Sequence, residues 1–165
     1  MDNYEELVKK ANEIKSGNGV DLSVEEDLSI AIMNLISLEE HFFFTAQKTG
    51  KDEYLGWLEK IREMRKSLLG MMIRQYEGEA WCIAKHLLAA SMRLIEVGTK
   101  MQSKGQIDQA KEMFGKSYEL FGLFFALRLK LIDLPESKKE DRLDDPDHPW
   151  TKEEIMNKLL DCCKE

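Results

Sequence analysis

The sequence predicts an all-α protein, an antiparallel up-down four-helix bundle with a short additional helix at each terminus. Long stretches contain no proline and are rich in Leu, Met, Ala, Glu and Lys, which favour helix. Apolar residues recur along these stretches with the helical period. Four of the stretches are separated by turns of only a few residues, so neighbouring helices should run antiparallel.

The first helix is short and amphipathic and is expected over residues 3–15, ending at the Ser-Gly-Asn-Gly sequence that follows. Ser23 and Glu26 have the spacing of a capping box, which predicts a first long helix over 24–48. Asp52 can cap the next one. The other three long helices are expected at 53–75, 79–103 and 106–133.

The chain divides into a helical body and a charged tail. Residues 1–134 should form the bundle, including the N-terminal short helix. Residues 135–165 should form a charged linker and a C-terminal helix over 152–163 that packs on the bundle. Thr151 and Glu154 have capping-box spacing, which supports that last helix.

Charge and composition argue against several classes of protein. The net charge is −7, and it is concentrated at the two ends of the chain. Nucleic acid is therefore not an expected partner, because its binding needs a basic face. The most apolar run, residues 120–134, contains Arg128 and Lys130 and is too short to span a bilayer, so no membrane partner is expected. The odd number of cysteines, three, and the acidic N-terminus without a signal-like segment predict a cytoplasmic protein.

The stretch 79–103 is apolar around most of its circumference. It carries a heptad seam and a second apolar line beside it, so it should be covered on more than one side. The terminal helices could supply that cover, or a second subunit could, which makes a homodimer the expected state. The seam consists of Ile83, Leu87, Ala90, Leu94, Val97 and Met101, and the second line of Trp81, Ala84, Leu88, Met92 and Ile95.

The stretch 53–75 should bury one apolar stripe, and a basic residue lies on that stripe. The stripe consists of Tyr54, Trp57, Ile61, Met64, Leu68 and Met72, and Arg65 lies between Ile61 and Leu68. Glu39 interrupts the stripe of 24–48 in the same way, between Leu35 and Phe42. When residues are counted outward from the turn near residue 51 along the two antiparallel helices, Glu39 falls opposite residue 62 or 63, close to Arg65.

The same counting across the turn near residue 105 places a third stripe residue, Arg128, close to Glu79. Buried charges are seldom left unpaired, so ion pairs that fix the helix register are expected. The alternative is that Glu39 and Arg65 line an interior pocket for a small ligand. The sequence leaves open whether Glu39, Arg65 and Arg128 are structural.

Cys82 and His86 are four residues apart on one helix, a spacing at which two side chains can bind one metal ion. Two ligands do not complete a zinc site, and His41 is too far along the bundle to contribute. A surface site made of Glu40, His41 and Glu63 is a further candidate. A ferritin-like site is not expected, because neither His41 nor His86 has a Glu three residues before it.

The sequence contains no phosphate-binding loop, nucleophile elbow, CxxC or HExxH motif, and no Arg-to-His spacing typical of helical-bundle ribonucleases. We therefore expect a non-enzymatic interaction or adaptor protein without a cofactor. It should self-associate through the helix at 79–103 or the helix at 106–133. The alternative is a small-ligand- or metal-binding bundle that uses the Glu39/Arg65 interior or the Cys82/His86 edge.

Overall fold

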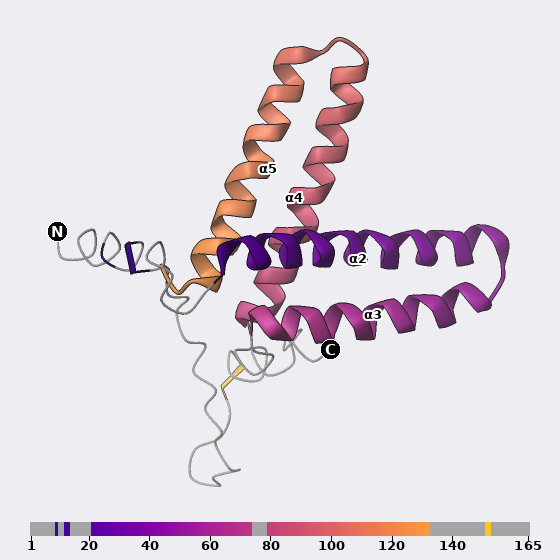
Figure 1. The fold of residues 1–165 in the computed structure, drawn as a ribbon. Coiled ribbons are helices and arrows are strands. Elements are labelled where there is room, and N and C mark those ends of the chain that lie inside the picture. The colour runs from indigo at the N-terminus through magenta and orange to yellow at the C-terminus, as the bar shows by residue number, and fades with distance from the viewer. Residues whose placement is uncertain (1–8, 10–11, 14–20, 74–78, 133–150, 153–165) are drawn as a thin grey trace, which may run out of the picture.

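The computed structural model describes residues 9, 12–13, 21–73, 79–132 and 151–152, and these ranges contain four long helices and no strand (Figure 1). The all-α class predicted from the sequence is confirmed. The helices are α2 (Leu22–Thr49), α3 (Glu53–Met72), α4 (Glu79–Ser103) and α5 (Ile107–Arg128).

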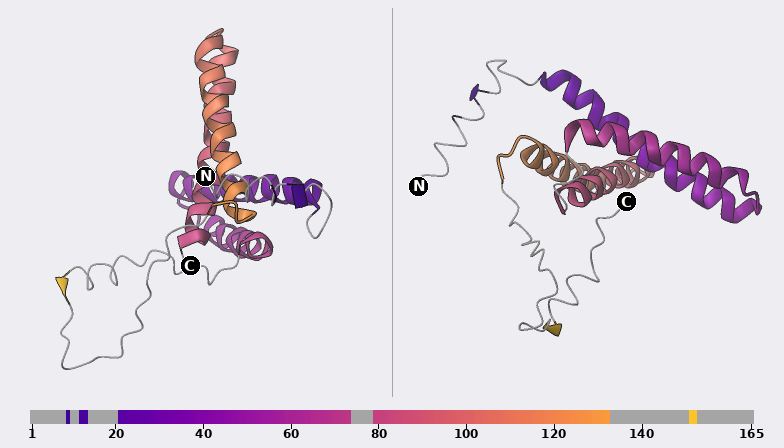
Figure 2. Two further views of the ribbon diagram at one scale, coloured as in Figure 1. Left: turned by 90° about the vertical axis from the view of Figure 1, so that its left-hand side faces the viewer. Right: turned by 90° about the horizontal axis from the view of Figure 1, so that it is seen from below.

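The four helices form two antiparallel hairpins, α2/α3 and α4/α5, which cross each other (Figures 1 and 2). The crossing lies near the start of α2 and the end of α3, so that one end of each hairpin extends beyond it. A single up-down bundle of four aligned helices is not confirmed, since the second hairpin runs across the first. Short turns dictate the antiparallel pairing inside each hairpin, but they do not dictate the angle between hairpins.

The first hairpin begins at a cap different from the predicted one. The Asp21 carboxylate accepts hydrogen bonds from the backbone N–H groups of Ser23 and Val24, at 3.0 and 3.4 Å. The proposed Ser23 cap is therefore wrong, and the helix starts two residues earlier than expected. At the other end Gly50 has a φ of 66° and its N–H donates to the Ala46 carbonyl, which ends α2.

The second hairpin turns at Gly105, whose φ is 74°, a conformation that favours glycine. Its second helix ends at Arg128, before the predicted end at residue 133. The Leu131 N–H donates to the Ala126 carbonyl while Lys130 adopts a φ of 54°, so a left-handed cap ends α5 ahead of Pro135.

The hydrophobic core lies at the crossing of the two hairpins. Trp81, only 1% exposed, is its largest side chain. The first half of α4 is buried on several sides, as its broad apolar arc predicted, and helices of the same chain supply the cover. The core consists of Ile32, Met33, Leu69, Met72, Ile73, Ala80, Trp81, Cys82, Ala84, Leu87, Leu88, Phe124 and Leu127.

Part of the stripe predicted to be buried on α3 is exposed. Trp57 and Met64 are 51% and 53% exposed, whereas Arg65 and Leu69 are fully buried. The reason is that α3 packs on α2 along a line centred on Arg65 and Leu69, which leaves Trp57 and Met64 on its flank. On α4 the predicted seam is likewise displaced, since Ala90 and Val97 are exposed.

The helices predicted at 3–15 and 152–163 fall almost wholly outside the described residues. The predicted domain boundary between residues 134 and 135 and the charged linker lie there as well. Within the ranges that the structure describes, no helix is both long enough and apolar enough to cross a membrane.

Candidate functional site

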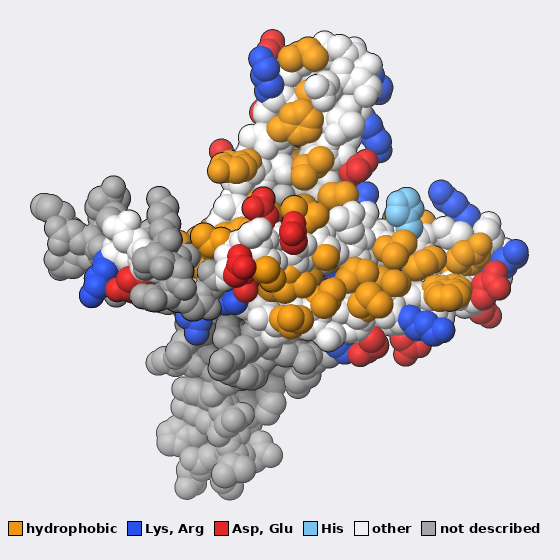
Figure 3. All heavy atoms as spheres, in the orientation of Figure 1, with side chains coloured by type: hydrophobic (Ala, Val, Ile, Leu, Met, Phe, Trp, Pro, Cys, Tyr) orange, Lys and Arg blue, Asp and Glu red, His pale blue; other side chains and the backbone are white. Residues whose placement is uncertain are grey.

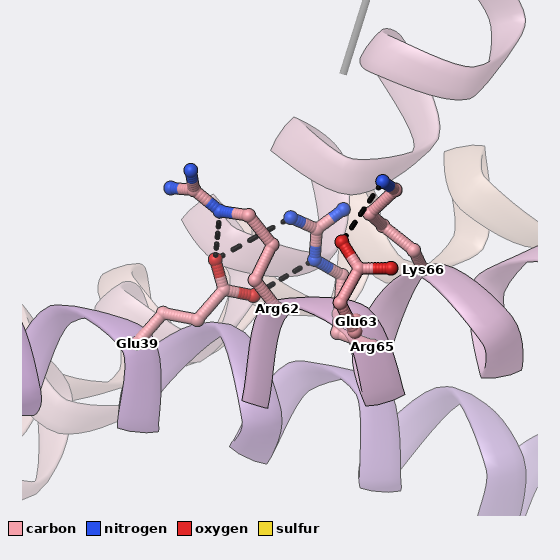
Figure 4. Close-up of polar contacts among 5 residues, drawn as sticks. All are labelled: Glu39, Arg62, Glu63, Arg65 and Lys66. Carbon is pink, nitrogen blue, oxygen red and sulfur yellow. Dashed lines mark hydrogen bonds and ion pairs between the residues drawn. The ribbon is translucent and has the colours of Figure 1, made fainter. Parts of the chain in front are cut away.

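Glu39 of α2 lies between two arginines of α3 (Figure 4). The Arg65 Nε donates to Glu39 Oε1 at 2.8 Å, and one of its terminal nitrogens lies 3.4 Å from Oε2. The Arg62 Nε donates to the same Oε2 at 3.2 Å. Arg62 and Arg65 are three residues apart, which places both on the side of α3 that faces Glu39. The predicted Glu39–Arg65 ion pair is confirmed.

Burial makes this group of three residues structurally important. The Arg65 side chain is 1% exposed and that of Glu39 is 12% exposed, whereas half of Arg62 is in water. Both carboxylate oxygens of Glu39 already accept hydrogen bonds from arginine, so the carboxylate is engaged without a ligand. No buried side-chain nitrogen or oxygen in the described part of the chain lacks a partner. This geometry favours a role in helix register over a ligand pocket.

Two further ion pairs lie where the hairpins cross. Arg128 of α5 donates from two nitrogens to Glu25 of α2, at 2.8 and 2.9 Å. The predicted Arg128–Glu79 pair is therefore wrong: counting along one hairpin cannot find a partner that belongs to the other. Arg93 of α4 pairs with Glu40 and donates to the Ser37 hydroxyl, both on α2.

Cys82 and His86 lie in different environments although they are one helical turn apart. The Cys82 side chain is buried in the core at the crossing, and His86 is exposed. Within the described ranges no three His, Cys, Asp or Glu side chains lie close enough together to hold a metal ion. The described residues thus supply no third ligand for this pair.

Two residues of the candidate surface metal site, which consisted of Glu40, His41 and Glu63, make other contacts. Glu40 pairs with Arg93, and Glu63 accepts a hydrogen bond from Lys66 at 3.1 Å. His41 is exposed on α2. The structure does not bring these three side chains together as a metal-binding group.

Sequence reasoning missed how α4 and α5 approach each other. Ser91 and Ser117 are both buried, and each hydroxyl donates to the other residue's carbonyl, at 3.0 and 2.9 Å. Further along the hairpin, the Phe114 ring occupies the space beside Gly98. The signal was present in the sequence, since Ser91 and Ser117 lie level across a turn near residue 105.

The α2/α3 hairpin carries an exposed apolar face. Trp57, Met64 and Met71 are each seven residues apart and are 51%, 53% and 67% exposed; we call them the α3 ridge. The Lys60 ammonium lies 4.8 Å from the centre of the Trp57 ring. Figure 3 shows a band of hydrophobic side chains along this hairpin, on the face turned toward the viewer of Figure 1.

The α4/α5 hairpin also exposes apolar side chains. Tyr118 is the most exposed, at 79%, and it is accompanied by Ile95, Val97, Ile107 and Leu123. Both hairpins therefore present hydrophobic side chains to solvent.

Comparison of this chain with protein-family models, with curated proteins and with solved structures finds no match.

Proposed function

We propose that this protein is a non-enzymatic interaction or adaptor protein that associates with itself. The observation that carries the proposal is the row of large apolar side chains exposed on both hairpins, above all the α3 ridge. Contiguous exposed apolar surface of this kind is typical of protein–protein contact sites.

The arrangement of the hairpins suits an adaptor. They share one core at the crossing and extend from it in different directions (Figure 2). Each carries its own exposed apolar side chains, so that one hairpin can bind a second copy while the other stays available to a different protein. The expected location is the cytoplasm, on the ground that the chain has an odd number of cysteines.

The alternative of a ligand- or metal-binding bundle receives no specific support from the described residues. Glu39 is engaged by Arg62 and Arg65, and the Cys82/His86 edge has no third ligand among them. The interaction proposal is therefore preferred.

The test is the mass of the purified protein in solution, measured by size-exclusion chromatography with light scattering over a range of concentrations. We expect a mass that approaches twice the 19.2 kDa of one chain as the concentration rises. A mass of one chain at every concentration up to the millimolar range would contradict self-association.

A further inference from the structure

We infer that two copies of this chain pair through the face of the α2/α3 hairpin that bears the α3 ridge. This inference rests on the proposed self-association and names its surface. The partner is a second copy, which presents the same face.

The face consists of the protruding α3 ridge and a less protruding row of side chains on α2. Beside the α3 ridge, α2 presents Ala31, Leu38 and Thr45, which are also seven residues apart; we call them the α2 line. Because the turn is centred near residue 51, each member of the α2 line lies level with one member of the ridge. The ridge side chains are large and largely exposed, whereas the α2 line holds smaller side chains, of which Leu38 and Thr45 are half-buried.

The face lies opposite the second hairpin. Arg93 of α4 contacts Ser37 and Glu40, which helical periodicity places on the far side of α2 from the α2 line. In Figure 1, α2 passes in front of α4, and the hydrophobic band of Figure 3 follows the side of α2 and α3 away from it. The second hairpin therefore does not obstruct a copy that docks here.

A ridge beside a lower line is self-complementary under a two-fold axis that runs along the hairpin. That rotation places the α3 ridge of each copy on the α2 line of the other, at the same level. Met71 then meets Ala31, Met64 meets Leu38, and Trp57 meets Thr45. Each of these contacts occurs twice, once in each direction, as an isologous interface requires.

Charge does not oppose this arrangement. Three of the five acidic residues of α2, Glu25, Glu39 and Glu40, already pair with arginines of the same chain. A copy that docks on the α2 line therefore does not have to bury these carboxylates without partners, and a low content of charged groups is typical of the centre of an interface.

The apolar area is of the right size for a dimer. Taking roughly 200 Å² for a large apolar side chain, the exposed parts of the three ridge residues amount to about 350 Å². A stable interface buries about 800 Å² on each partner, of which somewhat more than half is apolar. The ridge supplies most of that apolar share, and the α2 line with the neighbouring half-buried residues supplies the rest.

The surface differs from the one that the sequence indicated. The helix at 79–103 or the helix at 106–133 was expected to mediate self-association, because the former is apolar on several sides. The structure covers the first half of α4 with helices of the same chain. The longest regular line of exposed apolar side chains that we find on the described helices is the α3 ridge, on the other hairpin.

The experiment compares the dimer dissociation constants of three full-length proteins, the wild type and two variants, by sedimentation equilibrium. In the Met64→Glu variant a carboxylate replaces the middle of the ridge. We expect its dissociation constant to rise ~100-fold or more, because a charge would be buried in an apolar interface. The Tyr118→Glu variant is the matched control: it introduces the same charge at a more exposed site on α5 and should leave the constant within about threefold. Circular dichroism of each variant checks the fold.

A second variant, on the α2 line, tests the same interface if Met64→Glu is poorly folded. Ala31 is exposed, so Ala31→Trp is accommodated in one copy but obstructs Met71 of the second. We expect it to weaken the dimer to a similar degree.

The possible results distinguish the choice of interface from self-association itself. A dimer that resists both ridge and α2-line substitutions but dissociates in Tyr118→Glu would overturn the inference and leave self-association intact. A wild-type protein that is monomeric at all concentrations would overturn both, and the face would then belong to a different protein.

Discussion

The two hairpins have the same topology, but different chemistry holds their helices together. α2 and α3 are joined by a carboxylate between two arginines, at Glu39. α4 and α5 are joined instead by small residues that allow close approach, with Ser91 against Ser117 and Gly98 under the Phe114 ring. The first hairpin should therefore be sensitive to loss of charge, and the second to added volume.

The largest effect is expected at the charged contact. The substitution Glu39→Ala removes the carboxylate that neutralises Arg65, a side chain that is 1% exposed, and should lower the free energy of unfolding by about 3 kcal/mol. Urea denaturation followed by circular dichroism measures it. Glu63→Ala is the matched control, because the exposed Glu63–Lys66 pair should contribute less than about 0.5 kcal/mol. Equal effects of the two substitutions would show that burial does not distinguish the pairs.

The next largest effects come from two glycine substitutions in the second hairpin, which should change the free energy of unfolding in opposite directions. A Cβ on Gly98 would lie 2.5 Å from a carbon of the Phe114 ring, so Gly98→Ala should cost about 1–3 kcal/mol through overpacking. Gly115 lies within α5, and a Cβ added there would project into open space, so Gly115→Ala should instead stabilise by about 0.5–1 kcal/mol. Thermal unfolding of the two variants measures both. Stabilisation by both would mean that the helices are further apart than the structure shows.

A smaller effect is expected at the paired hydroxyls. Either Ser91→Ala or Ser117→Ala removes a buried hydrogen bond to a carbonyl and should cost about 1 kcal/mol. The hydroxyl oxygens lie 2.9 Å apart, so the double variant should cost less than the sum of the single ones. A double-mutant cycle in urea tests this coupling, and strict additivity would argue against contact between the two hydroxyls.

The smallest effect is expected from charge on the outside of the second hairpin. Lys116 donates to Glu112 at 2.6 Å and, through this hydrogen bond and its charge, lowers the pKa of Glu112. A lowered carboxyl pKa stabilises the fold at pH values above the ordinary pKa of the group. This stabilisation is lost as the pH falls through the lowered pKa. The pair is exposed, so Glu112→Gln should leave the unfolding midpoint at pH 7 within experimental error. A clear drop would mean that this exposed pair stabilises α5 itself more than such pairs usually do.

Sequence periodicity predicted the helices well because each one is long and strongly patterned. It also paired Glu39 with Arg65, since both lie on stripes of neighbouring helices joined by a short turn. It failed where the answer depends on the other hairpin. The partner of Arg128 is Glu25, more than a hundred residues away, and no count along one hairpin can reach it.

The exposure of the α3 ridge was missed for a related reason. Periodicity shows that Trp57 and Met64 share a side of the helix with other apolar residues, but it does not show which part of a broad stripe faces α2. The placement of Arg65 at the centre of the contact, through Glu39, turns the ridge outward. The Glu39–Arg65 contact thus aligns α2 with α3 and leaves the apolar face open.

We propose that a second copy of the chain covers this open face. The most direct test is fluorine NMR of protein labelled with 5-fluorotryptophan, with the Trp57 signal assigned from the Trp57→Phe variant. Trp57 is 51% exposed and Trp81 is 1% exposed, so dilution through the dimer dissociation range should shift the Trp57 signal and leave that of Trp81 unchanged. A Trp57 signal that stays constant while the mass of the particle halves would contradict the claim.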